Sequence, residues 1–329
     1  MENILIIRLK AIGDVVQTLP AVHAVRENFS AAKITFLTSK ENTSLLNGFL
    51  EVDEVIGLDR AALRSGNPIR ILREFFALLR RLRAGKFSLV VDLQGYGETA
   101  WLTWFTGAPQ RWRGIYGAGR SWAYTQHIKH GPEAHGALWH LRLLEQCGLK
   151  MGNVRNVFTL PEPAVNEART WFASHQLDST KPTIYFQPFT SSPDKNWPLE
   201  NYLTVARHWR EQGMQIILGG GPADRAALEP AKNEGFAVSA GVPLLVTGGL
   251  MQLSTLVFGG DTGALHLAVA QGKRVLMLMQ EVTPGSPIPF QHPDWVLAPA
   301  SGGIAKISVT EVNAAVAQIF NRPAGNVSC

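Results

Sequence analysis

Short apolar runs alternate with longer segments of helical spacing along the whole chain. In the first half the runs lie at residues 4–7, 34–37, 52–56 and 89–93, and residues 68–83 have helical spacing. Runs of this length are typical of buried strands, and apolar residues three or four positions apart are typical of helices. Buried strands separated by helices predict a parallel sheet that is covered on both faces, and therefore an α/β fold.

The same alternation begins again after a proline-containing stretch that ends at Pro163. The later pattern predicts helices at 164–176, 199–212, 223–233 and 309–320, and strands at 183–186, 214–218 and 275–278. We expect two doubly wound domains, 1–160 and 161–329, and leave open that the last helix packs back toward the first domain. Chain length is sufficient for two hydrophobic cores.

Residues 256–270 combine a strand end, a glycine-rich turn at 259–263 and a helix from Ala264. Backbone N–H groups at the positive end of a helix dipole suit a phosphate group. A plain helix start explains the same residues, with Asp261 or Thr262 as the N-cap. This stretch alone does not decide between the two interpretations.

Three other loops that follow predicted strands carry polar residues of interest. Asp14 follows Gly13 and opens a helix, so it is either a general base for an attacking hydroxyl or a helix cap. In the loop 190–198, hydroxyl groups and Lys195 suit phosphate oxygens, while the alternative is a solvated loop with its tryptophan in the core. The three glycines at 219–221 would let the backbone approach a ligand closely. Asp224 beside them is better explained as an N-cap than as a residue that binds a ribose hydroxyl.

These loops have a common position in the predicted fold. Open parallel sheets bind ligands beyond the carboxyl ends of their strands. If the two domains face one another, the loops at Asp14, 190–195, 219–224 and 261–263 meet in one cleft.

Two further patterns have weaker functional interpretations. Residues 95–100 fit the G-x-G-x-x-A pattern of dinucleotide oxidoreductases, but arginines occupy the region where the acidic ribose ligand is expected. Four histidines crowd one segment, and packing explains them better than metal binding does: His127, His130, His135 and His140. We therefore expect no metal site and no cofactor.

Charge divides unevenly between the two halves. Residues 1–160 hold 20 Lys and Arg against 13 Asp and Glu, a balance of +7, and residues 161–329 hold 11 against 13, a balance of −2. The basic half is expected to face an anionic partner. The most basic segment, 60–86, has one apolar helix face, so it is a core helix with a solvated basic side, a surface for anionic lipid or glycolipid, or both.

Several classes of protein are disfavoured by the sequence. No run of about 18 apolar residues is long enough for a membrane span. No secretion signal is recognisable at the N-terminus, and the two cysteines are far apart, which together favour the cytoplasm. The basic segment lacks the interleaved aromatic residues of a nucleic-acid surface, so we expect no nucleic-acid partner.

Four blocks resemble, in the right order, a known family of enzymes. They are residues 8–14 with Thr18-Leu19-Pro20, residues 91–95, residues 194–198, and Gly260-Asp261-Thr262-Gly263 with His266. The set resembles the ADP-heptose:lipopolysaccharide heptosyltransferases of glycosyltransferase family 9. That resemblance implies a GT-B fold, with two Rossmann-like domains, and an inverting transfer of heptose to an inner-core sugar of lipopolysaccharide.

The resemblance also implies roles for individual residues. Asp14 matches the proposed base, Lys195, Thr262 and Gly263 match ligands of the donor diphosphate, Asp261 matches a contact to the donor sugar, and His266 lies on the donor side. Together with the hydroxyl-bearing loop and the glycine turn described above, these matches give the expected donor-binding residues Thr190, Ser191, Lys195, Gly220, Asp224, Asp261, Thr262, Gly263 and His266. The N-terminal domain would bind the acceptor through Arg8, Lys10, Gly13, Gln94, Arg64 and Arg120.

A helix N-terminus and one lysine can stabilise a leaving diphosphate, so we expect a metal-independent reaction. The expected partners are a nucleotide-sugar donor, ADP-heptose by the resemblance, and an anionic lipid-linked glycan. The expected location is the cytoplasmic side of the inner membrane, with peripheral contact to it.

Two segments depart from the family pattern or weaken the fold prediction. Residues 279–285 replace the Gly-Pro-Thr turn common in the family, which leaves the donor open. Gly248 and Gly249 predict a weak helix over 243–252. A different nucleotide-sugar donor, an epimerase or hydrolase of the same fold, a dinucleotide oxidoreductase and a non-catalytic binding relative remain as alternatives.

Overall fold

The computed structural model describes residues 2–63, 66–115, 119–129 and 135–321. The chain divides into two compact units, Met1–Asn156 and Val157–Cys329. The division lies close to the domain join that the sequence predicts after residue 160.

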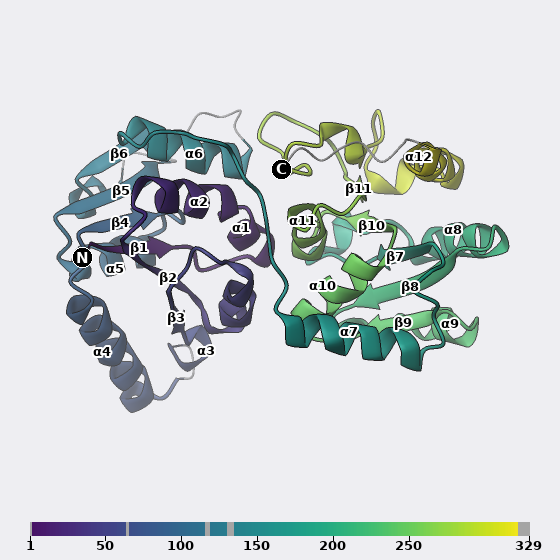
Figure 1. Cartoon of the computed structure of the whole chain (residues 1–329), viewed down its shortest axis with the longest axis horizontal. Coiled ribbons are helices and arrows are strands. Elements are labelled where there is room, and N and C mark those ends of the chain that lie inside the picture. The colour runs from purple at the N-terminus through teal and green to yellow at the C-terminus, as the bar shows by residue number, and fades with distance from the viewer. Residues whose placement is uncertain (1, 64–65, 116–118, 130–134, 322–329) are drawn as a thin grey trace. The chain divides into compact units, whose positions relative to one another are not determined.

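The N-terminal unit is built on a six-stranded parallel sheet in the order β3-β2-β1-β4-β5-β6 (Figure 1). Its strands are β1 Asn3–Ile7, β2 Lys33–Ser39, β3 Glu54–Leu58, β4 Leu89–Asp92, β5 Gln110–Ile115 and β6 Gln126–Lys129. Its helices are α1 Ile12–Val16, α2 Leu19–Asn28, η1 Lys40–Gly48, α3 Arg60–Leu63, α4 Pro68–Ala84, α5 Gly97–Thr106, η2 Ser121–Ala123 and α6 Gly136–Gln146, where η marks a 3₁₀ helix.

Helices cover both faces of this sheet. On one face Leu5 and Ile7 of β1 pack with Leu78 and Leu82 of α4 and with Leu102 of α5. On the other face α2 packs against α6 (Figure 1). Successive side chains of a strand point to opposite faces, so the apolar run of β1 supplies both cores.

The C-terminal unit repeats this architecture with the order β12-β11-β10-β7-β8-β9. Its strands are β7 Thr183–Gln187, β8 Gln215–Gly220, β9 Ala237–Ala240, β10 Leu256–Gly260, β11 Val275–Leu278 and β12 Val296–Leu297. Its helices are α7 Glu162–Ser174, η3 Pro193–Lys195, α8 Leu199–Glu211, η4 Pro222–Asp224, α9 Glu229–Asn233, α10 Leu244–Leu253, α11 Gly263–Ala270, η5 Pro293–Trp295, η6 Ile304–Lys306 and α12 Val309–Asn321. Numbered within each unit, both sheets have the Rossmann order 3-2-1-4-5-6.

One core of this unit contains the last helix. Val312 and Val316 of α12 are buried in a cluster with Trp197, Tyr202 and Phe258. The sequence left open that this helix returns to the first domain. Its buried face belongs to the core of the C-terminal unit, where α12 packs against α8.

The structure corrects the weak helix expected over 243–252. Helix α10 runs from Leu244 to Leu253, and both of its glycines are buried. A Cβ on Gly249 would stand 2.5 Å from the Cβ of Ala168 in α7. The glycine therefore lowers intrinsic helix propensity but lets two helices approach closely, and tertiary packing outweighs propensity.

Other differences concern the boundaries and polarity of elements. The helix expected at 223–233 is divided into η4 and α9, and the glycines at 259 and 260 end β10 rather than begin the turn. Strands β5 and β6 do not follow from the apolar pattern because they alternate polar residues such as Arg111, Arg113 and His127 with apolar ones.

The close contact of β10 with β7 gives a stability prediction. Gly259 lies beside Gln187 in the strand register, and a Cβ at this glycine would overlap the Gln187 carbonyl oxygen. Since backbone must move to admit the methyl group, Gly259→Ala should lower the free energy of unfolding by about 1–3 kcal/mol in urea denaturation.

Gly221→Ala is the matched control for this variant. Gly221 has an ordinary φ of −71°, and its Cβ would stand 3.5 Å from the nearest carboxylate oxygen of Asp224, a normal van der Waals distance. Equal stability of the two variants would contradict the packing argument.

Candidate active-site loops

In the N-terminal sheet, β1 and β4 are neighbours whose chains continue into helices on opposite faces. The loop from β1 to α1 carries Arg8 to Asp14, and the loop from β4 to α5 carries Gln94 and Gly95. This is the topological switch point, where open parallel sheets bind their ligands. The two N-terminal blocks singled out in the sequence therefore lie side by side.

Of the two roles that the sequence allows for Asp14, the structure shows the helix cap. Its Oδ2 accepts a hydrogen bond from the Ala11 backbone N–H at 3.0 Å and lies 2.7 Å from Nη2 of Arg8. The Oδ1 atom has no hydrogen-bond partner among the described residues, and the side chain is 45% exposed. One carboxylate oxygen thus caps α1, while the other is accessible to a ligand.

Neighbouring side chains hold the loop that carries Asp14. Oε1 of Gln94 accepts hydrogen bonds from the backbone N–H groups of Leu9 at 3.0 Å and Lys10 at 3.3 Å. The Asn42 amide donates to the Leu9 carbonyl at 3.0 Å. The sequence predicts Gln94 among the acceptor-binding residues, but its side chain is buried and its carbonyl oxygen accepts hydrogen bonds from the loop.

The second loop of this unit does not have the features of a dinucleotide site. Both the Gln94 and Gly95 N–H groups donate to Oδ1 of Asp92 at 2.9 Å, so the turn's own carboxylate occupies the donors that a pyrophosphate would need. The Tyr124 hydroxyl donates to Oδ2 of Asp92 at 2.6 Å. Burial raises the pKa of Asp92, although these hydrogen bonds oppose the shift.

In the C-terminal sheet the switch point lies between β7 and β10. Strand β7 leads to α8, whose core residues lie on one face, and β10 leads to α11, whose core residues lie on the other. The loop after β7 carries Thr190 to Lys195. It packs against the end of β10, since a Cβ on Gly260 would stand 2.7 Å from Cγ2 of Thr190.

Asp261 links the two loops at this switch point. Its Oδ2 lies 3.4 Å from Nζ of Lys195, and its Oδ1 lies 3.2 Å from Nε2 of His266. Burial alone would raise the pKa of Asp261, but the hydrogen bond and charge of His266 and the charge of Lys195 outweigh it and hold the pKa below its usual value. Asp261 is therefore an ionised carboxylate at neutral pH.

Helix α11 begins directly after this carboxylate. Thr262 is its N-cap, and the Thr262 hydroxyl accepts a hydrogen bond from the Leu265 N–H at 3.3 Å. Gly263 and Ala264 occupy the first two helical positions, where N–H groups have no acceptor within their own helix. The structure thus assigns capping to Thr262 and leaves Asp261 to contact Lys195 and His266.

A hollow of about 150 Å³ lies beside this cluster. It is lined by Lys195, Asp261, Leu278, Met279, Gln280, Glu281, Ser286 and Pro287. The segment 279–285, which departs from the family pattern, therefore reaches the candidate donor site. Sequence reasoning did not include Met279 or Gln280, although that departure was the available signal.

Two of the other predicted donor residues, Thr190 and Asp224, make hydrogen bonds within their own loops. The Thr190 hydroxyl donates to the Ser192 carbonyl at 2.8 Å within its own loop, and Ser191 is exposed beside it. The turn after β8 lies one strand away from the switch point. There Asp224 accepts a hydrogen bond from the Gly221 N–H at 2.7 Å, which agrees with the capping role favoured from the sequence, and Gly220 packs closely against it.

Of the remaining predicted acceptor-binding residues, the structure describes Lys10, Gly13 and Arg120. Lys10 is exposed and Gly13 is half-buried in the loop of Asp14. Arg120 is exposed, and its Nε would stand 3.3 Å from a Cβ on Gly97 at the start of α5. Arg64 lies outside the described residues, as does His130 of the histidine segment.

The described histidines of that segment are mostly structural. His135 caps α6 by accepting from the Ala137 N–H at 3.2 Å. Burial lowers the pKa of His140 to about 3, and His127 is exposed. Within the described ranges there is no group of three or more His, Cys, Asp or Glu side chains placed to hold a metal ion. Nor does that part of the chain contain a helix long and apolar enough to cross a membrane.

Comparison with known protein families gives one match that covers most of the chain. The model of glycosyltransferase family 9 (heptosyltransferase) matches residues 75–298. The lipopolysaccharide core heptosyltransferase OpsX of Haemophilus influenzae is 23% identical over 310 residues, covering 90% of this chain and 84% of the relative. Lipopolysaccharide heptosyltransferase 2 of Escherichia coli is 24% identical over 313 residues, covering 88% and 86%.

Solved structures show the same fold. A family 9 glycosyltransferase from Veillonella parvula superposes with a TM-score of 0.87 at 21% identity, covering 97% of each chain. The E. coli heptosyltransferase WaaC with ADP gives a TM-score of 0.78 at 19% identity, covering 96% of this chain and 99% of the other. These neighbours confirm the predicted GT-B type of α/β fold. The chain belongs to glycosyltransferase family 9, the heptosyltransferase family, and is a glycosyltransferase.

Proposed function

We propose that the enzyme transfers heptose from ADP-heptose to an inner-core sugar of lipopolysaccharide, with inversion at the anomeric carbon. The observation that carries this proposal is the cluster of Lys195, Asp261 and His266 at the N-terminus of α11. It places one cation, one anion and free helix N–H groups at a switch point. A nucleotide sugar requires the same combination, because it presents both phosphates and sugar hydroxyls.

In this mechanism Asp14 is the general base. The acceptor hydroxyl oxygen attacks the anomeric carbon of the donor while Oδ1 of Asp14 takes its proton. Oδ2 keeps its hydrogen bond to Ala11 and its ion pair with Arg8, so the carboxylate is oriented before the acceptor binds. Gln94 acts on the same step indirectly because it holds the loop that carries Asp14.

The leaving group departs as ADP, which takes both electrons of the broken bond between the anomeric carbon and the phosphate oxygen. Lys195 and the first N–H groups of α11 would stabilise the charge that grows on the diphosphate. In the structure the Lys195 ammonium group pairs with Asp261. A bound donor diphosphate would compete with Asp261 for this ammonium group. Asp261 would then be available to a sugar hydroxyl, held in place by His266.

We assign the acceptor to the N-terminal unit and the donor to the C-terminal unit. Lys10 and Arg120 are exposed cations that would attract an anionic, lipid-linked core. The reaction would take place without a metal ion, at the cytoplasmic face of the inner membrane. Met279, Gln280 and Glu281 line the hollow beside Asp261 and would contribute to the choice of nucleoside or sugar.

The variant Asp14→Asn tests the base. Asparagine can still accept a hydrogen bond from Ala11, but it cannot accept the proton, so kcat should fall by roughly 10²- to 10⁴-fold. The donor dissociation constant, measured by calorimetry, should not change.

Glu98→Gln is the matched control for this variant. Glu98 also lies in the first turn of a helix, pairs with an arginine at 3.3 Å and has a side chain that is 43% exposed. A wild-type kcat for Asp14→Asn, or an equal loss in Glu98→Gln, would show that Asp14 is not the base.

The variant Lys195→Ala tests the donor side. Because the ammonium group would stabilise a charge that grows in the transition state, kcat should fall by roughly 10²-fold and the donor KM should rise. Lys232→Ala removes a lysine that is also paired with a carboxylate in this unit, with Glu229 at 3.9 Å, and should have wild-type kinetics. Unchanged donor kinetics in Lys195→Ala would exclude the phosphate role.

A further inference from the structure

Helix α4 has an apolar face that only partly enters the core. The sequence places Ile71, Leu72, Phe75, Leu78, Leu79 and Leu82 on one face of this helix, which is either a core helix with a solvated basic side, a surface for anionic lipid or glycolipid, or both. In the structure Leu78 and Leu82 are buried, whereas Ile69 is 78%, Leu72 53% and Phe76 62% exposed. The N-terminal half of the helix therefore presents large apolar side chains outward, and Figure 1 shows it extending past the sheet.

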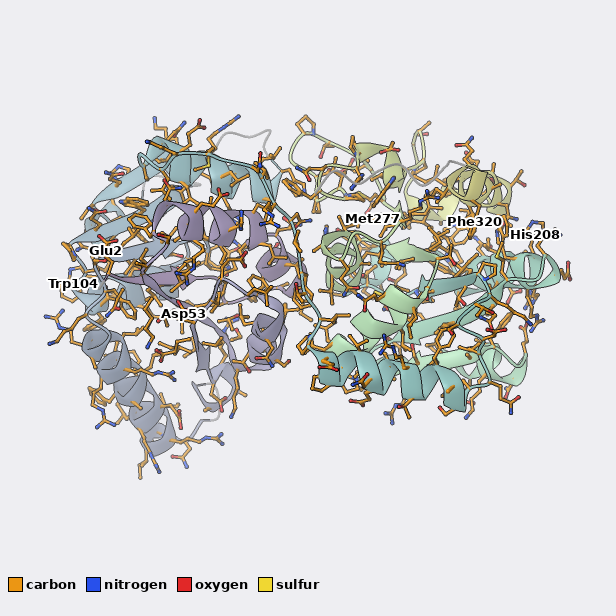
Figure 2. The ribbon with its side chains drawn as sticks, in the orientation of Figure 1. Glu2, Asp53, Trp104, His208, Met277 and Phe320 are labelled. Carbon is orange, nitrogen blue, oxygen red and sulfur yellow. The ribbon has the colours of Figure 1, made fainter. Side chains whose placement is uncertain are left out.

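Aromatic side chains continue this exposed surface on the neighbouring helix. The rings of Trp101 and Trp104 of α5 and of Trp122 of η2 lie 4.6–6.2 Å apart, and each of the three residues is about half exposed. Phe105 links the cluster to α4, with its ring 5.3 Å from that of Trp104. Figure 2 shows Trp104 at the margin of the N-terminal unit, beside α4.

Two hollows lie between α4 and α5, and they differ in chemistry. The larger, of about 650 Å³, is lined by Phe76, Leu79, Arg80, Arg83, Trp104, Phe105, Gly107 and Arg111. The smaller, of about 370 Å³, is mostly apolar and is lined by Leu58, Phe75, Leu78, Glu98, Trp101, Leu102 and Phe105. The first suits an anionic group next to an apolar chain, and the second suits an apolar chain.

The arginines of this surface are available for an external anion. Arg73, Arg80 and Arg83 are exposed, and no carboxylate of the described residues lies within ion-pair distance of them. By contrast Arg81, on the same helix, pairs with Glu54 at 2.7 Å. Unpaired guanidinium groups around exposed indole rings match the region of a bilayer where phosphate headgroups meet acyl chains.

We propose that this surface, formed by α4, α5 and η2, docks the enzyme on an anionic lipid bilayer. The exposed residues of α4 and the three tryptophans enter the interface, and a lipid phosphate binds in the hollow lined by Arg80, Arg83 and Arg111. The positive charge of the surface disfavours a second copy of this chain as its occupant, because two copies would bring like charges together. Asp14, Lys195 and Asp261 lie on other loops, and vesicle binding is measured without either substrate, so the docking test does not depend on the proposed transfer reaction.

Sedimentation with vesicles tests the docking surface, using phosphatidylcholine alone or mixed with phosphatidylglycerol. The wild-type protein should bind the anionic vesicles, bind the neutral ones much more weakly, and lose affinity as salt rises. Arg80→Glu with Arg83→Glu should weaken binding by at least roughly fivefold for each arginine removed. Trp101→Ser with Trp104→Ser should also weaken it, by roughly tenfold or more.

Matched controls lie elsewhere on the protein. Leu138→Ser removes a 51% exposed apolar side chain from α6, on the other face of the sheet, and Arg169→Glu reverses an exposed arginine on α7 of the C-terminal unit. Both should bind vesicles as the wild type does. Circular dichroism melts identify any variant that is unfolded.

A second measurement needs no destabilising substitution. Brominated acyl chains quench tryptophan fluorescence at short range, so anionic vesicles that contain them should quench the wild type. Trp101→Phe with Trp104→Phe should show less of this quenching. Absence of vesicle binding by the wild type, equal loss in the controls, or a self-association that the tryptophan variants abolish would overturn the proposal.

Discussion

Both halves of the molecule depend on two neighbouring parallel strands whose chains leave toward opposite faces of the sheet. Helices then cover the two faces of the sheet but not the carboxyl ends of those two strands, so the loop residues at these ends stay accessible. In the N-terminal unit this places Asp14 beside the loop of Gln94, and in the C-terminal unit it places Lys195 beside Asp261. The candidate site residues thus lie on short loops that follow buried strands, and Asp14, Lys195 and Asp261 each contact a neighbouring charged side chain.

The candidate site residues of these loops also make structural contacts. Asp14 caps a helix with one oxygen and exposes the other, and Asp261 is held by His266 on one side and Lys195 on the other. Capping by one oxygen of Asp14 therefore leaves the other oxygen available for the catalytic role that we propose. At the start of α11 the two tasks are divided, because Thr262 caps the helix and its first N–H groups remain for a ligand.

The alternation of apolar runs predicts the α/β class, the two units and most strands, because buried parallel strands are apolar throughout. It does not predict β5 and β6, because these strands carry arginine and histidine where a buried strand usually has apolar residues. Local propensity also misjudges α10, where Gly249 serves the packing of two helices. The residue block 8–14 marks Asp14 as a candidate base, but only the fold shows that the Gln94 side chain accepts hydrogen bonds from the backbone of the same loop. Only the fold shows, too, that the N-terminal half of α4 exposes large apolar side chains instead of burying them in the core.

We propose above that heptose passes from ADP-heptose to a lipopolysaccharide core acceptor. Mass spectrometry of a reaction with both substrates and a chelator tests it most directly. We expect an acceptor heavier by one heptose residue, one ADP for each transfer, and no consumption of donor when the acceptor is omitted. Consumption of ADP-heptose without an acceptor would indicate an epimerase or a hydrolase, and no product with both substrates present would contradict the proposed function.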